Sequence, residues 1–141
     1  MTESIVANSI QTPPQTWESE PLRQSREAKS QNLRLLNAHP LNQAALRRIQ
    51  KERLSPQLES TTDPWASPLF LLARHYLFSQ LEEPDPESEE AIELAIVMDS
   101  PHQQLLMIDN LPWEDPSDIE TMTEEELQEG VMDLIRQRLR P

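Results

Sequence analysis

Proline and glycine usage restricts the fold of this chain more than any other feature. The 141 residues include 13 Pro and a single Gly, Gly130. Proline fixes φ and suits the first turn of a helix, whereas the tight turns of β-hairpins need residues that reach positive φ, above all glycine. The chain contains neither an Asn-Gly nor an Asp-Gly pair. We therefore predict an all-α fold, a small helical bundle of about five or six helices.

The segment from residue 63 to residue 81 is expected to form the central helix of that bundle. It holds both Phe residues, the only Tyr and one of the three Trp residues. At a helical step of about 100° per residue, its apolar side chains cover most of the circumference, which is typical of a buried helix. It is too short and too charged to cross a bilayer, which takes about 20 apolar residues. The core predicted around it consists of Trp65, Leu69, Leu72, Ala73, Tyr76, Leu77, Leu81, Ile92, Ile96, Leu105, Ile108, Leu127, Val131 and Leu134.

Proline positions and capping residues mark the other helices. Proline suits the first helical position, and Ser, Thr or Asp just before it satisfies free backbone N–H groups. Thr123 and Glu126 form a capping box that gives the clearest helix start. The predicted helices span residues 21–37, 40–54, 63–81, 86–98, 101–108 and 124–140. The apolar runs 92–98 and 104–109 could instead pair as strands, so an α+β fold with a hairpin at 92–109 is the alternative.

Three segments of the chain differ in composition. Residues 1–20 are polar, include two prolines and have no hydrophobic period, so we predict a disordered N-terminal arm. Residues 21–58 are expected to form a basic helical segment, and residues 59–141 an acidic helical core domain.

Charge is distributed unevenly along the chain, whose formal net charge is −13. Residues 23–53 hold eight Lys or Arg against Glu27 and Glu52, whereas residues 75–135 hold eighteen Asp or Glu and no Lys or Arg. Two interpretations are open. The two halves neutralise each other within the fold, or at least one of them contacts a charged partner.

Catalytic, cofactor-binding and metal-binding residues are not predicted. The chain has no Cys, which excludes disulfides and thiolate sites and permits a reducing compartment. The three His have no metal-ligand spacing, and a single Gly cannot build a phosphate-binding loop. Carboxylates are abundant, but no pattern among them separates a general acid from a base. The start of the chain has no secretory pattern, so we expect a soluble cytoplasmic protein. Because no catalytic or cofactor-binding pattern is found, we also expect that it is not an enzyme and needs no cofactor.

Several isolated residues are candidates for contact with a partner. Trp17 stands alone in the polar arm, where it either contacts nothing or anchors the arm in a groove. Gly130 lies inside the last predicted helix, where Gly costs about 0.5–1 kcal/mol relative to Ala, so it is either accidental or marks a close neighbour. Trp113 lies in a Pro-rich connector and is expected to cover an end of the core. The helix over 40–54 is basic and amphipathic, with Arg47, Arg48, Lys51 and Arg53 on its outer face.

These features predict a non-enzymatic protein–protein interaction module, such as an adaptor, assembly chaperone or regulator, that presents an acidic helical surface. Its expected partner is another protein with a basic surface. No membrane is expected as a partner, and the oligomeric state is left open. One alternative is a nucleic-acid-binding protein that uses the basic helices of 23–53. The other is an acidic mimic of nucleic acid that occupies the basic groove of a DNA- or RNA-binding protein. The residues predicted to contact a partner are Trp17, Arg47, Arg48, Lys51, Trp113 and Gly130.

Overall fold

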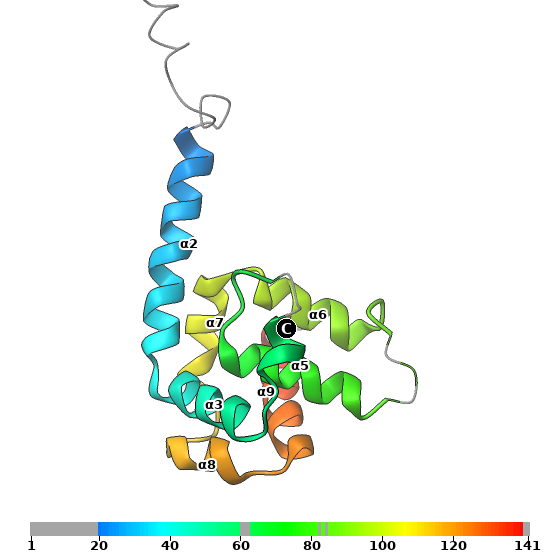
Figure 1. The fold of residues 1–141 in the computed structure, drawn as a ribbon. Coiled ribbons are helices and arrows are strands. Elements are labelled where there is room, and N and C mark those ends of the chain that lie inside the picture. Colours follow the sequence, from blue (N-terminus) through cyan, green and yellow to red (C-terminus); the bar gives the residue numbers. More distant parts are fainter. Residues whose placement is uncertain (1–19, 60–62, 82, 84, 140–141) are drawn as a thin grey trace, which may run out of the picture.

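The structure, a computed structural model, describes residues 20–59, 63–81, 83 and 85–139 of the chain. The expectations for the N-terminal arm and for Trp17 lie outside these residues, apart from Glu20, which begins the first described helix. The described part contains eight helices (Figure 1). They are α2 (Glu20–Ala38), α3 (Pro40–Lys51), α4 (Ser55–Glu59), α5 (Pro68–Ser79), α6 (Glu89–Met98), α7 (Pro101–Ile108), α8 (Pro116–Thr121) and α9 (Glu124–Leu139).

Every regular element in the described ranges is a helix, so the all-α prediction is confirmed and the hairpin at 92–109 is wrong. Two capped helices, α6 and α7, occupy that stretch. The Ser88 hydroxyl accepts a hydrogen bond from the N–H of Ala91 at 3.3 Å, and the Ser100 hydroxyl accepts one from Gln103 at 3.2 Å. These caps favour helices over strands for short apolar runs. The short helices α4 and α8 are additional to the predicted ones.

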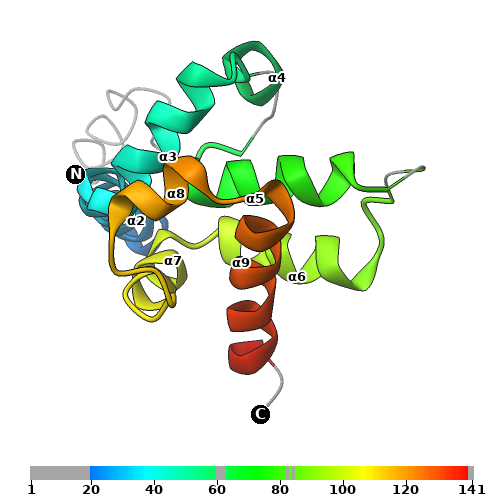
Figure 2. The ribbon, with the colours of Figure 1, turned by 90° about the horizontal axis from the view of Figure 1, so that it is seen from below.

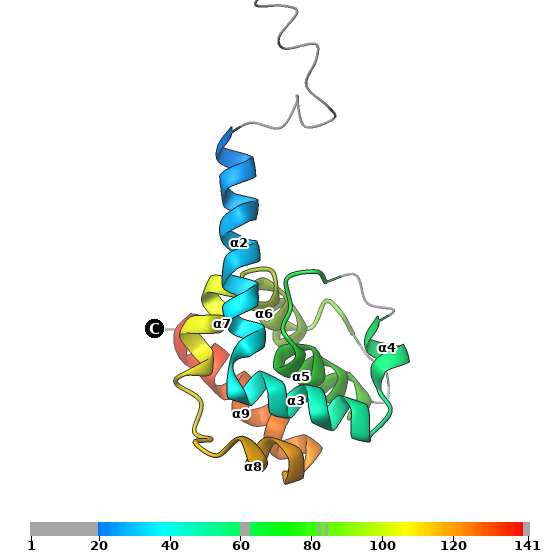
Figure 3. The same ribbon diagram turned by 60° about the vertical axis from the view of Figure 1, so that its left-hand side comes forward.

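Helix α5 lies at the centre of the bundle, as the apolar character of its segment predicts. Helices α3, α6 and α9 all contact it, and α9 crosses α5 and α6 when the molecule is seen from below (Figure 2). Helix α8 packs against α3 (Figure 3). Helix α2 runs along α7, and its N-terminal half extends beyond the rest of the bundle (Figure 1). Helices from both sides of residue 58 therefore build one core.

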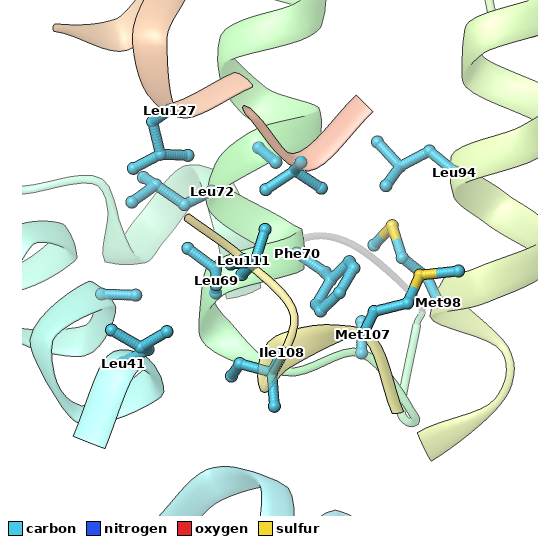
Figure 4. Close-up of a cluster of buried hydrophobic side chains, with 14 of the residues drawn as sticks. Leu41, Leu69, Phe70, Leu72, Leu94, Met98, Met107, Ile108, Leu111 and Leu127 are labelled. Atoms are coloured by element: carbon cyan, nitrogen blue, oxygen red, sulfur yellow. The ribbon is translucent and has the colours of Figure 1, made fainter. Parts of the chain in front are cut away.

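The core is a single hydrophobic cluster in which side chains of α5 meet those of α3, α6, α7 and α9 (Figure 4). Most of the predicted core residues are buried in it. These are Leu69, Leu72, Ala73, Tyr76, Leu77, Ile108, Leu127 and Val131.

Three predicted core residues are instead on the surface. Ile92 and Ile96 of α6 are 47% and 55% exposed, and Leu81, beyond the end of α5, is 41% exposed. Three more are only partly buried: Trp65, Leu105 and Leu134. Helix α6 is apolar on most sides, so its contacts with α5, α7 and α9 decide which side faces inward. The residues of α6 that its packing buries are Ala91, Glu93, Leu94, Val97 and Met98.

Two buried amide side chains connect segments that are distant in sequence. Asn42 donates to the carbonyl oxygen of Leu36 at 2.7 Å and accepts from the N–H of Leu69 at 2.8 Å, which joins the end of α2 to the start of α5. Gln104 accepts from the N–H of Ser67 at 2.9 Å, which ties α7 to the same helix start. Buried polar groups need such partners, because an unpaired one costs about 1–3 kcal/mol.

Helix α3 ends earlier than predicted, at Lys51 rather than Leu54. Arg53 adopts the left-handed conformation, with φ of 58°, and the N–H of Leu54 bonds back to the carbonyl of Ile49 at 2.9 Å. This is the Schellman arrangement that commonly closes a helix, here with Arg at the position that usually holds Gly. The next helix, α4, begins directly at Ser55.

Candidate partner-binding surface

Arg48 is predicted to face outward, but only 5% of the residue is exposed. Its Nε donates hydrogen bonds of 2.8 Å to the Tyr76 hydroxyl and to Oε2 of Glu52. Its Nη1 donates to the carbonyl oxygens of Ile119 at 2.9 Å and Met122 at 2.6 Å. The guanidinium therefore fastens α3 to α5 and α8, and these bonds occupy the group that would contact a partner.

Tyr76 shares this buried network. Its hydroxyl donates a hydrogen bond of 2.6 Å to Oε1 of Glu52. Burial, and next the bond to the Glu52 carboxylate, raise the pKa of Tyr76 well above its ordinary value of about 10. The phenol therefore stays neutral in the folded protein.

We expect the folded protein to show no phenolate absorbance near pH 10. Tyr76 is the only Tyr in the chain, so this absorbance reports on it alone. Because its pKa is raised in the folded state, its contribution to stability is fully present below about pH 10, and is lost as the pH rises toward the folded pKa. The free energy of unfolding should thus fall more steeply above pH 10 in the wild type than in Tyr76→Phe. A phenolate midpoint near 10 in folded protein would contradict this expectation.

The other cations of the basic segment differ in their surroundings. Nε of Arg47 lies 3.2 Å from Oε2 of Glu120 in α8. Nζ of Lys29 lies 3.8 Å from Oδ2 of Asp99 and 5.6 Å from the centre of the Trp65 ring. Lys51 is exposed at the end of α3. The basic segment is thus docked on the acidic half, through ion pairs at two places.

Helix α6 carries an exposed stripe at spacings of three and four residues. We use the name α6 stripe for Glu89, Ile92, Ala95, Ile96 and Asp99, all of which are exposed. The two isoleucines lie one helical turn apart, and a carboxylate stands at each end of the stripe. Single exposed apolar residues are ordinary, whereas Ile92 and Ile96 are four residues apart, a spacing at which side chains on a helix are neighbours.

A pocket of about 430 Å³ lies between the α2–α3 corner and the connector from α7 to α8. We call it the corner pocket. Its lining residues are His39, Pro40, Leu41, Ile108, Asp109, Leu111, Trp113, Glu114 and Pro116. His39 closes the corner, because its Nδ1 accepts from the N–H of Leu41 at 3.1 Å while its Nε2 contacts Oδ1 of Asp109 at 3.0 Å.

Gly130 makes room for Trp113. A Cβ atom at position 130 would lie 2.7 Å from Cη2 of the Trp113 indole and nearer still to Cζ2. Carbon atoms do not approach so closely without displacement of the ring. The close neighbour of Gly130 is therefore Trp113 of the same chain, which is itself predicted to contact a partner.

We expect Gly130→Ala to destabilise the protein by about 1–3 kcal/mol, because the added methyl group overpacks against the indole. In a Trp113→Ala background the same change should raise stability by up to about 1 kcal/mol, since Ala is the better helix former. Urea unfolding of the four proteins in this double-mutant cycle measures the coupling. Equal effects of Gly130→Ala in both backgrounds would rule out the steric explanation.

The structure brings together only some of the predicted site residues. Trp113 and Gly130 are in contact, and Arg48 is buried. Arg47 and Lys51 lie on the surface of α3 and are not among the residues that line the corner pocket. Sequence reasoning missed Asp109 and Glu114 as residues that line the same pocket as Trp113, although they lie only four positions before it and one position after it. It also assigned Ile92 and Ile96 to the core rather than to a surface.

Two searches of the described residues concern metal ions and membrane-spanning helices. No group of three or more His, Asp or Glu side chains there could hold a metal ion. None of the described helices has the length and apolar character to span a membrane. Comparisons with protein-family models, with curated proteins and with solved structures gave no match.

Proposed function

We propose that this protein is a non-enzymatic protein–protein interaction module whose α6 stripe binds a basic amphipathic helix of a partner. The observation that carries the proposal is the pair of exposed isoleucines, Ile92 and Ile96, between two carboxylates on one helical face. A helix that docks in this way places apolar side chains at spacings of three and four residues on such a surface. Its Lys or Arg side chains would meet Glu89 and Asp99, since the Asp99 side chain stays 76% exposed beside Lys29.

Electrostatics favour a basic partner. The net charge of −13, concentrated in residues 75–135, attracts cations over the range set by the Debye length, which is about 8 Å at physiological salt. Apolar contact then supplies most of the affinity. A cytoplasmic location, as an adaptor, assembly chaperone or regulator, belongs to the same proposal.

Nucleic-acid binding through residues 23–53 has less support. Lys29, Arg47 and Arg48 contact other parts of the same chain, so phosphate contacts would compete with existing ones. Mimicry of nucleic acid is a special case of binding a basic protein. If duplex DNA competes with this protein for the bound partner, the protein acts as a mimic of nucleic acid.

The proposal is tested with a labelled amphipathic Leu/Lys peptide and the full chain, by fluorescence anisotropy. Each half-exposed isoleucine offers about 1 kcal/mol of further burial, so Ile92→Ser with Ile96→Ser should weaken binding by about 2 kcal/mol, or about thirtyfold. Ser and Ile have similar helix propensities, so folding should be preserved. Leu35→Ser is the matched control, because Leu35 is 63% exposed on α2.

The same three proteins should then be used to isolate partners from cells. We expect a basic protein that co-purifies with the wild type and with Leu35→Ser, but not with the double variant. Peptide affinity equal in all three proteins would refute the role of the α6 stripe.

A further inference from the structure

We infer that the corner pocket binds the guanidinium group of an arginine side chain from a protein partner. The inference rests on the proposed function for its biological setting, since both require a basic partner, but it concerns a different surface. The pocket combines an aromatic wall, Trp113, with two carboxylates, Asp109 and Glu114. Guanidinium is the side-chain group that stacks on an indole and also bonds carboxylates with a planar set of N–H donors.

The carboxylates of the pocket are available to a ligand. The Asp109 side chain is 75% exposed, so one oxygen can accept from His39 while the other faces solvent. Glu114 is exposed, and among the described residues it has no ion-pair partner. Lys and Arg are absent from the pocket lining. A cation bound here would therefore not compete with one supplied by the described part of the chain.

His39 positions one of the two pocket carboxylates. Its Nδ1 accepts the N–H of Leu41, which places the ring proton on Nε2, facing Asp109. The ring thereby orients the Asp109 carboxylate at the pocket. No Lys or Arg of the lining opposes the negative charge of the two carboxylates.

Gly130 explains how the aromatic wall is held. The indole of Trp113 is partly buried and packs its edge against the backbone of α9 at Gly130, where any other residue would displace it. A glycine inside a helix costs about 0.5–1 kcal/mol relative to alanine. Close packing of Trp113 beside two carboxylates gives that glycine a role in the shape of the pocket.

The test follows the indole N–H resonance of Trp113 in full-length protein labelled with ¹⁵N-tryptophan. The resonance is assigned with Trp113→Phe, and those of Trp17 and Trp65 serve as internal controls. The probes are the N-acetyl methylamides of arginine, lysine and citrulline, because citrulline has the shape of arginine without its charge. We expect a saturable shift of the Trp113 resonance with the arginine probe, and at least tenfold weaker binding of the citrulline probe.

Charge-neutralised variants complete the test. Asp109→Asn keeps an oxygen that can accept from His39, so the corner should persist. Combined with Glu114→Gln, it should lower the affinity for the arginine probe about tenfold. Absence of a saturable shift, or unchanged affinity in this variant, would overturn the inference, and equal binding of the lysine probe would overturn the assignment to guanidinium. Ile92→Ser with Ile96→Ser should leave the arginine shift unchanged, which separates failure of this pocket from failure of the α6 stripe.

Discussion

Replacing Arg48 with Met should lower the free energy of unfolding by about 2–4 kcal/mol. Methionine fills similar space but donates no hydrogen bond. The Ile119 and Met122 carbonyl oxygens would lose their guanidinium donor, and the Glu52 carboxylate would lose its cation. The loss is below the upper end for buried ion pairs, because the Glu52 side chain is 34% exposed and water can reach it.

Arg47→Met is the matched control for this prediction. Arg47 is the adjacent residue of the same type, and its side chain is 51% exposed with a single ion pair to Glu120. Exposed pairs contribute about 0–1 kcal/mol, so this change should be small. Adding Glu52→Gln to Arg48→Met should restore part of the stability, because it removes the uncompensated carboxylate. Equal unfolding midpoints for the two single variants would show that the buried network does not stabilise the fold.

The position of Arg48 in the sequence of α3 indicates that it is buried, although its charge suggests an exposed side chain. Arg48 follows Leu41 by seven residues and Ala45 by three, so it lies on the apolar row of α3. Grouping it with Arg47 and Lys51 by charge alone assigned it to the wrong face. Leu46, an apolar residue of the same helix, is 38% exposed. Apart from Glu52, the partners of Arg48 lie 28 to 74 residues away in the chain, and local patterns do not identify such contacts.

Helix identity was predictable because its signals are local. Pro40 and Pro101 stand at first helical positions, and Ser100 caps α7 as its sequence suggests. The inward face of α6 was not predictable, because nearly all sides of that helix are apolar and only tertiary packing distinguishes them. Its exposed isoleucines, the basis of the proposed function, appear as a surface only after α5, α7 and α9 are placed.

The corner pocket shows the same division between local and distant information. Gly130 and Trp113 each attract attention in the sequence, one as an expensive helical glycine and the other as an isolated aromatic. Their contact across 17 positions requires the folded arrangement of the connector on α9. His39 looked unremarkable in the sequence, but it is the residue that links the α2–α3 corner to Asp109.

Leu72→Ala should lower the free energy of unfolding by about 2–5 kcal/mol. Leu72 is completely buried in the central helix and lies beside Leu127 of α9 (Figure 4). The change removes apolar burial and leaves a cavity where α5 contacts α9. Since domains of this size are stable by about 5–15 kcal/mol, the loss is a large part of the total.

Leu35→Ala provides the comparison, because it deletes the same atoms from a helical residue that is 63% exposed. With little burial to lose and a gain in helix propensity, its effect should stay within about 0.5 kcal/mol. Urea unfolding of both variants, with the slope checked for constancy, measures the difference. A cavity at Leu72 would also be expected to bind xenon, whereas the collapse of α9 into the space would lower the cost toward 2 kcal/mol. Equal effects of the two substitutions would mean that α5 is not the central helix. The packing of α6 against α5, which leaves the α6 stripe exposed, would then have to be revised.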